Sequence, residues 1–168
     1  MFENIIKNVH NRHPLIHCIT NYVSINDCAN IVLACGGAPI MAEDINEVSQ
    51  ITSICQGLDI NIGMLNDNKL SSMLKAGATA NELGIPVILD PVGAGSSDYR
   101  IKAVQNLMSN VQFGVIRGNV SEIKAIAAKQ GIHNIAAGVY ETMQKNKSAM
   151  GVEAGIADKI TDDNIKEM

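Results

Sequence analysis

The sequence predicts an α/β protein in which a mainly parallel sheet lies between two layers of helices, giving three layers in all. Short apolar runs alternate along the chain with longer segments whose apolar residues recur at helical spacing. Strands joined through helices pair in parallel, with helices on both faces of the sheet. With 168 residues, 46% of them hydrophobic and 18% charged, the chain is expected to form one domain over residues 1–168.

The first strand and helix follow a polar N-terminal segment. Residues 15–19 form a short apolar run of the β type, and residues 25–33 carry apolar side chains on one helical face. Ser24 stands before this helix and Asp27 follows three positions later, which is the spacing of a capping box. A pair of glycines then predicts the end of the helix.

The same unit repeats four more times. The next two strands are predicted at "APIM" and "LDINIG", followed by helices that begin at Asp44 and near Asp67. The last two strands, "PVILD" and "VQFGVIR", precede helices over 99–108 and 120–130. Residues 132–168 fit the pattern poorly, so the sheet is expected to be incomplete at the C-terminal side.

Composition argues against several classes of partner. The formal net charge is −4, only 3% of the residues are aromatic and Trp is absent, so neither a basic face for phosphate backbones nor a base-stacking platform is expected. The core should be aliphatic and rich in Met. No long apolar segment or signal-like leader predicts secretion or membrane spanning. The four cysteines lack CxxC spacing, which favours buried, reduced and inert thiols in a cytoplasmic protein.

The residues that follow the strands are the candidates for a functional site, because ligands of open α/β sheets bind at the carboxyl ends of the strands. These positions hold amides, acids, an arginine and glycines: Asn21, Met41, Glu43, Asn66, Asp67, Asp90, Gly93, Gly95, Arg117, Asn119 and Glu122. Such a set suits a divalent cation and a polyphosphate. Carboxylates are hard ligands for magnesium, guanidinium pairs with phosphate oxygens, and glycines let a ligand approach the backbone.

Each candidate also has a purely structural interpretation. Glu122 follows Asn119 by three positions and could complete a capping box, either instead of a ligand role or together with it. The glycines could serve only a tight turn. Asp90 ends an apolar strand, so its carboxylate is expected to be partly buried and to face a cation or a donor. Arg117 could be a solvated strand end, and Met41 could fill the core.

Three histidines near the N-terminus raise the question of a metal site. His10, His13 and His17 lie within eight residues, but Pro14 prevents one helix from carrying all three. We therefore expect structural histidines rather than metal ligands.

Three stretches together resemble the hydroxyethylthiazole kinase family of the ribokinase-like superfamily. "HCITNYVSINDCANIVLACGGAPIMAEDINEV" (17–48) is similar to the N-terminal signature of that family, and "VILDPVGAGSSDYR" (87–100) and "VIRGNVSEI" (115–123) are similar to its two central motifs. The three occur in the family's order, and the resemblance covers about residues 14–128.

This resemblance implies a kinase that uses magnesium and ATP to phosphorylate the primary hydroxyl of 4-methyl-5-(2-hydroxyethyl)thiazole in thiamine biosynthesis or salvage. It assigns the thiazole to Asn21, Val23 and Met41. The remaining implied roles are ATP binding by Arg117 and Asn119 and metal binding by Asp90 and Glu122. It also implies a ribokinase-like fold and a homo-oligomer, a trimer in the family, with the thiazole pocket between subunits.

The resemblance ends before the family's C-terminal motifs. No stretch after Gly131 resembles the glycine-rich anion hole or the residue beside it that acts on the substrate hydroxyl. The chain is therefore expected to correspond to the N-terminal portion of the family domain, with the catalytic residues outside it. Two alternatives stay open: a non-catalytic module that binds thiazole or a partner, and another ribokinase-like vitamin kinase, such as one for hydroxymethylpyrimidine.

Overall fold

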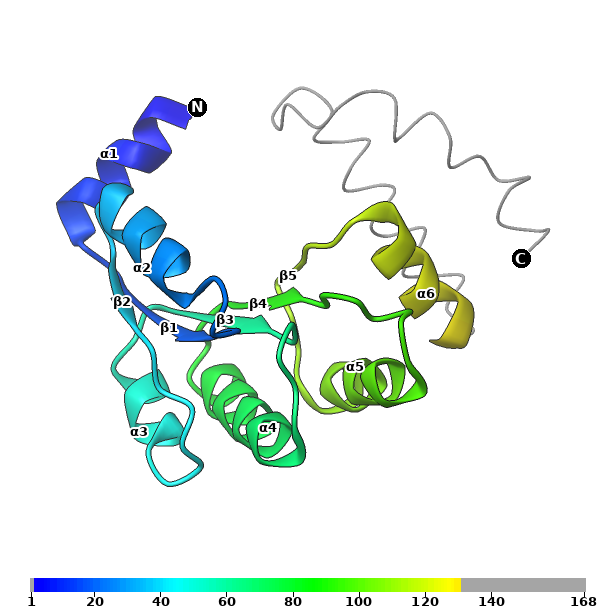
Figure 1. Ribbon diagram of the computed structural model, residues 1–168. Coiled ribbons are helices and arrows are strands. Elements are labelled where there is room, and N and C mark those ends of the chain that lie inside the picture. Colours follow the sequence, from blue (N-terminus) through cyan, green and yellow to red (C-terminus); the bar gives the residue numbers. More distant parts are fainter. Residues whose placement is uncertain (1, 131–168) are drawn as a thin grey trace.

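The computed structural model describes residues 2–130, which form a five-stranded sheet with six helices (Figure 1). The strands are β1 (Leu15–Ile19), β2 (Ala38–Ile40), β3 (Gly57–Asn61), β4 (Val87–Asp90) and β5 (Val115–Ile116). The helices are α1 (Phe2–Arg12), α2 (Ile25–Ala34), α3 (Val48–Ser53), α4 (Asp67–Glu82), α5 (Asp98–Asn110) and α6 (Val120–Gln130).

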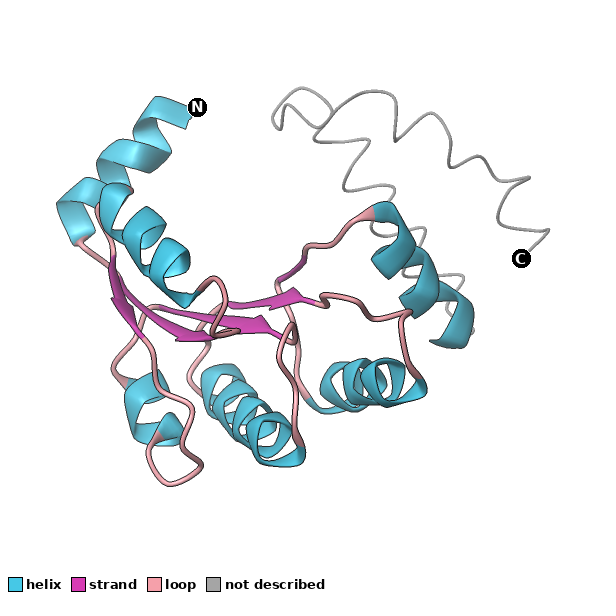
Figure 2. Ribbon diagram, viewed as in Figure 1, coloured by secondary structure: helices cyan, strands magenta, loops and turns pink. Residues whose placement is uncertain are grey.

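All strand pairs of the described sheet are parallel, in the order β2-β1-β3-β4-β5. Helices α3, α4 and α5 cover one face, and α1, α2 and α6 lie on the other side (Figures 1 and 2). The predicted three-layer α/β architecture is therefore confirmed for the described residues. Because the strands run the same way, their carboxyl ends share one edge of the sheet.

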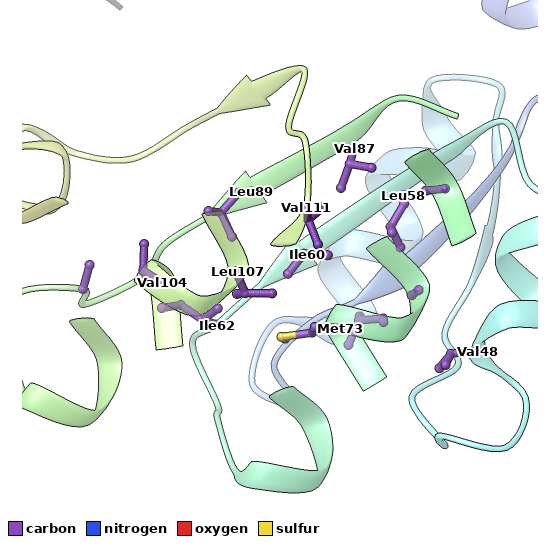
Figure 3. Close-up of a cluster of buried hydrophobic side chains, with 14 of the residues drawn as sticks. Val48, Leu58, Ile60, Ile62, Met73, Val87, Leu89, Val104, Leu107 and Val111 are labelled. Atoms are coloured by element: carbon purple, nitrogen blue, oxygen red, sulfur yellow. The ribbon is translucent and has the colours of Figure 1, made fainter. Parts of the chain in front are cut away.

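The main core lies between the sheet and the layer formed by α3, α4 and α5 (Figure 3). Alternate residues of the central strands point into it, including Leu58 and Ile60 of β3 and Val87 and Leu89 of β4. The core is aliphatic as predicted, but it is not rich in Met. Met73 is the one methionine among its fully buried members within residues 2–130.

The opposite face of the sheet is less completely covered by the described residues. Ile88 of β4 is 41% exposed and Val115 of β5 is 53% exposed. Helix α2 is apolar in sequence yet has no fully buried residue. The side chains on this face therefore contribute less to the described core than those facing α4 and α5.

Most predicted elements are confirmed, and two predictions need correction. The polar N-terminal segment, for which no element was predicted, forms α1. Helix α3 begins at Val48 rather than Asp44, because Asp44 accepts hydrogen bonds from Asn46 in the preceding turn. Strand β5 covers two residues, whereas seven were predicted (111–117). The predicted strand began too early, because the Val111 amide still donates to the Leu107 carbonyl oxygen and so belongs to the end of α5. Residues 132–168, which fit the sequence pattern poorly, lie outside the described residues.

The cysteines also differ in part from expectation. Cys18 and Cys55 are buried, and burial raises the pKa of the Cys18 thiol to about 12, as an inert thiol requires. Cys28 is only partly buried and Cys35 is exposed. Within residues 2–130, no helix has the length and apolar character needed to cross a bilayer.

Candidate functional site at the carboxyl ends of the strands

A row of polar side chains crosses the carboxyl ends of four strands. The Asn21 side-chain nitrogen lies 3.2 Å from Asn61 Oδ1, and Asn61 Nδ2 donates to Asp90 Oδ2 at 3.0 Å. Arg117 Nη1 reaches the same Asp90 oxygen at 3.2 Å. Three of these residues were predicted from the sequence, and Asn61 links them. We call Asn21, Asn61, Asp90 and Arg117 the polar row.

Asp90 is the partly buried acid of the polar row, with a side chain 19% exposed. Burial raises its pKa and the nearby Glu122 charge adds to this, while the charge of Arg117 and the Asn61 hydrogen bond act in the other direction. The pKa stays above its ordinary value. Both described donors bond Oδ2, and a carboxylate can accept a further cation or donor at its other oxygen. The predicted environment of Asp90 is confirmed.

Arg117 holds Asp90 from the solvent side. Its side chain is 78% exposed, so the ion pair itself contributes little to stability. The guanidinium has five N–H donors, and its exposure suits an anionic ligand that approaches from solvent.

Glu122 joins the glycine loop to the start of α6. Its Oε1 accepts from the Gly93 amide at 2.9 Å, and its Oε2 accepts from the Asn119 amide at 2.8 Å. Asn119 Oδ1 in turn accepts from the Glu122 amide at 3.0 Å. The capping box that the sequence left open is present. Gly93 adopts a φ of +66°, a conformation that favours glycine.

Arg100 was missed by the sequence argument although it lies within the second quoted stretch. Its guanidinium donates to the carbonyl oxygens of Ile62 at 2.6 Å, Val92 at 2.9 Å and Gly63 at 2.8 Å. It therefore ties the connection after β3 to the connection after β4. A basic residue in the first turn of a helix opposes the helix dipole, and this was a signal that Arg100 has a specific partner.

Asn21 organises the connection after β1. Its Oδ1 accepts from the backbone amide and the hydroxyl of Ser24, each at 3.0 Å. Ser24 is the N-cap residue of α2 but its side chain makes no capping bond, so the predicted capping box with Asp27 is wrong. The Ser24 hydroxyl instead donates to the side-chain oxygen of Asn21. Val23 is 88% exposed.

Met41 lies apart from the polar row. It follows β2, the edge strand opposite β5, and is partly buried. Four strand spacings of about 4.8 Å place the ends of β2 and β5 about 19 Å apart. Met41 and Arg117 therefore lie too far apart for one small heterocycle to contact both within one chain, whereas Met41 and Asn21 follow neighbouring strands.

A second cluster, of which the sequence predicted Glu43 alone, lies under the connections after β1 and β2. Lys69 of α4 is buried, forms an ion pair with Glu43 at 2.8 Å and donates to the Thr20 carbonyl oxygen. The Tyr22 hydroxyl donates to the other Glu43 oxygen, and the Lys69 ammonium lies 4.6 Å from the centroid of the Tyr22 ring. We call Tyr22, Glu43 and Lys69 the lysine cluster.

The pKa of Glu43 reports the balance within this cluster. Burial raises it, but hydrogen bonds from Lys69 and Tyr22 and the charge of Lys69 outweigh burial, so the pKa lies below its ordinary value. Glu43 is therefore a carboxylate at neutral pH. The sequence did hold a signal that Lys69 is buried: it stands at helical spacing from Ser72, Met73 and Ala76, on the buried face of α4.

Asp59 introduces a further carboxyl group on the sheet, beside the polar row. Burial raises its pKa to about 6, and the charge of Asp90 adds to this while Arg117 acts against it. The alternation of Asp59 and Asn61 with Leu58 and Ile60 was the signal that both polar residues share one face of β3.

The three histidines each bond a protein group, as a structural role requires. His10 Nδ1 lies 3.1 Å from the Ile6 carbonyl oxygen and His13 Nδ1 lies 3.1 Å from that of Gly36. His17 is buried, with Nε2 2.8 Å from the Ala42 carbonyl oxygen. Burial lowers the pKa of His17, with the Ala42 bond acting in the opposite direction.

The fold and the candidate site together define a class: a parallel α/β protein with a row of polar side chains at the carboxyl ends of its strands. The model of the hydroxyethylthiazole kinase family matches residues 6–162, beyond the segment that carried the resemblance. The chain is 53% identical over 165 residues to a hydroxyethylthiazole kinase of Clostridium acetobutylicum, covering 98% of this chain and 55% of that protein. This chain belongs to the hydroxyethylthiazole kinase family.

Two further proteins agree with this assignment. A hydroxyethylthiazole kinase of Methanobrevibacter smithii is 44% identical over 163 residues, or 97% of this chain and 53% of the relative. The structure of hydroxyethylthiazole kinase from Pyrococcus horikoshii OT3 matches with a TM-score of 0.74 and 39% identity, over 79% of this chain and 52% of that one. The chain spans about half the length of these relatives.

Proposed function

We propose that this chain provides part of the active site of an ATP-dependent kinase that phosphorylates the primary hydroxyl of 4-methyl-5-(2-hydroxyethyl)thiazole. The γ-phosphorus of ATP forms a bond to the hydroxyl oxygen, its bond to the β,γ-bridging oxygen breaks, and the hydroxyl proton is lost. ADP and the thiazole phosphate are the products. The polar row is the observation that carries the proposal, because it joins the acceptor side at Asn21 to the phosphate side at Asp90 and Arg117.

On the phosphate side, Arg117 and Asn119 are proposed to bind ATP. The exposed guanidinium of Arg117 can pair with phosphate oxygens, and its contact with Asp90 fixes its direction. The connection after β4 is rich in glycine and is fixed by Glu122 and Arg100. Phosphoryl transfer depends mainly on positioning and charge stabilisation, so a site of few prearranged groups is sufficient.

The residues present fit a magnesium ion. Within residues 2–130 no group of three or more acids, histidines or cysteines is placed to hold a metal, whereas Mg²⁺ commonly uses one or two carboxylates with water and phosphate oxygens. Asp90 can offer its other carboxylate oxygen for this role, and Glu122, whose oxygens both accept backbone amides, would act through water. Bound magnesium would neutralise negative charge on the phosphates.

On the acceptor side, Asn21, Val23 and Met41 are proposed to contact the thiazole. Asn21 and Met41 follow neighbouring strands, which favours a shared role. We further propose a cytoplasmic homo-oligomer, a trimer, in which this side meets another subunit. Sedimentation analysis of the full chain tests the trimer directly, and a monomer at all concentrations would contradict it.

The test is phosphorylation of the thiazole by the purified 168-residue chain and by Asp90→Ala, with Asp98→Ala as an exposed control. Measured together with any further polypeptide that turnover needs, activity is expected to fall about a hundredfold or more in Asp90→Ala, the scale set by losing one preorganised electrostatic group, and to persist in Asp98→Ala. Preference for hydroxymethylpyrimidine as acceptor would instead indicate another vitamin kinase.

Calorimetry separates catalysis from binding. The proposal requires the chain to bind both Mg·ATP and the thiazole, including when turnover needs a further polypeptide. Thiazole binding without nucleotide binding would favour a non-catalytic binding module. Binding of neither would contradict the proposed site.

A further inference from the structure

Lys69 occupies an unusual position for a lysine. It lies in the first turn of α4 and is only 4% exposed. A buried ammonium is costly unless it is paired and hydrogen-bonded, and a cation at a helix N-terminus also opposes the helix dipole. The compensation comes from outside the helix, through Glu43, the Thr20 carbonyl oxygen and the Tyr22 ring.

These partners belong to two separate connections. Thr20 and Tyr22 follow β1, whereas Glu43 follows β2. The Tyr22 hydroxyl also bonds Glu43 directly, so the ammonium, the carboxylate and the phenol form a closed set of contacts. Lys69 therefore fixes the two connections relative to each other and to α4.

The same connections carry the residues proposed to contact the thiazole. Asn21 and Val23 lie on either side of Tyr22 in the sequence, and Met41 lies two residues before Glu43. Val23 is almost fully exposed, so packing within the chain does little to fix it. The contacts of the lysine cluster are thus placed to hold these residues in one arrangement.

We propose that Lys69 is a positioning residue for the acceptor side of the site: it holds the connections after β1 and β2 together so that Asn21, Val23 and Met41 meet the thiazole in one geometry. This inference rests on the proposed function for the identity of the ligand. It assigns Lys69 no contact with the reacting atoms. Its effect is expected on thiazole affinity and not on nucleotide affinity, because Arg117 lies near the far edge of the sheet.

The experiment compares four variants of the 168-residue chain with the wild-type chain. Lys69→Met removes the charge but keeps an unbranched side chain, and Lys69→Arg restores the charge. Glu43→Gln removes the charge that pairs with Lys69. Because Glu43 is partly exposed, this variant can test the same ion pair if Lys69→Met does not fold. Lys75→Met is the matched control, because this exposed lysine of the same helix also bonds a carbonyl oxygen, that of Ile45 at 2.8 Å.

Two readouts are measured: calorimetric affinity for thiazole and for Mg·ATP, and hydrogen exchange of the amides of residues 20–24. We expect Lys69→Met to weaken thiazole binding by roughly tenfold to a hundredfold, the scale of a misplacement of about 1 Å. Exchange at 20–24 should accelerate about tenfold or more, as expected for a segment that opens locally. Lys69→Arg should recover part of both effects, Glu43→Gln should reproduce them in part, and Lys75→Met should change neither.

The outcomes separate this inference from the proposed function. Unchanged thiazole affinity and unchanged exchange at 20–24 in folded Lys69→Met would overturn the inference while leaving the kinase proposal standing. Equal losses of thiazole and nucleotide binding would also overturn it, as a general structural effect. If the wild-type chain binds no thiazole, the proposed function fails, and exchange at 20–24 alone then decides whether Lys69 holds the two connections.

Discussion

Replacing Asn61 by Ala tests the link on which the polar row depends. The Asn61 amide serves three groups: Oδ1 accepts from the Gly63 amide at 2.8 Å and from Asn21 Nδ2 at 3.2 Å, and Nδ2 donates to Asp90 Oδ2 at 3.0 Å. Asn61 is itself buried at the end of β3. The substitution therefore removes one partner from each of three groups at once.

The expected loss of stability follows from these contacts. Each hydrogen bond contributes about 1 kcal/mol net, and a buried group left without a partner costs about 1–3 kcal/mol. Because Asn21 and Asp90 are partly solvated and keep other partners, we expect a loss of about 3 kcal/mol in the free energy of unfolding. For a chain of this size, this corresponds to a fall in Tm of about 6–12 °C.

The assay is urea unfolding of the full chain followed by circular dichroism, with Asn26→Ala as the control. Asn26 is an exposed asparagine of α2, and its substitution should change the free energy of unfolding by about 0.5 kcal/mol or less. If Asn61→Ala and Asn26→Ala unfolded at the same urea concentration, the polar row would not be the connected network described above, and the reasoning would be refuted.

Two further predictions concern stability. Burial raises the pKa of Asp59 from 3.8 to about 6, so the folded state favours the protonated carboxyl group. The stability that this group contributes is fully present below about pH 4 and is lost as the pH rises through about 6, so Asp59→Asn should stabilise the chain by up to about 3 kcal/mol at pH 7.5 and by much less at pH 4. Thermal melts at both pH values check this, and destabilisation at pH 7.5 would contradict it. A Cβ at Gly77 would lie 2.5 Å from Val111 Cγ2, so Gly77→Ala should cost about 1–3 kcal/mol despite the better helix propensity of Ala. Urea unfolding checks this second change, which should be partly recovered by adding Val111→Ala, and an unchanged midpoint would contradict it.

The fold could be predicted because its signals are local and repeated. Strand β1 and helix α6 have the predicted bounds, since apolar runs, helical spacing and glycine or proline boundaries act over a few residues. Strand β5 was predicted too long because an apolar sequence also suits the end of a helix and the turn that follows. Helix α1 was missed although Ile5, Ile6 and Val9 recur at helical spacing, because the segment is polar overall and Ile5 and Ile6 stay exposed.

The site could be predicted only in part, for a different reason. Asp90 and Arg117 follow strands, and parallel pairing brings strand ends together regardless of the details of packing. Asn61, Lys69 and Arg100 owe their importance to partners 26 to 49 residues away. A polar residue on a buried face indicates that such a partner exists, but the sequence does not specify which residue it is. The same limit explains why the hydroxyl of Ser24 bonds Asn21 instead of capping α2.

The most direct test of the polar row as one ligand site is an NMR titration that follows the side-chain amide signals of Asn21 and Asn61. We predict that thiazole shifts the Asn21 signals, and that Mg·ATP shifts those of Asn61 through its hydrogen bond to Asp90. Saturating amounts of both ligands that left all four N–H signals in place would contradict the account.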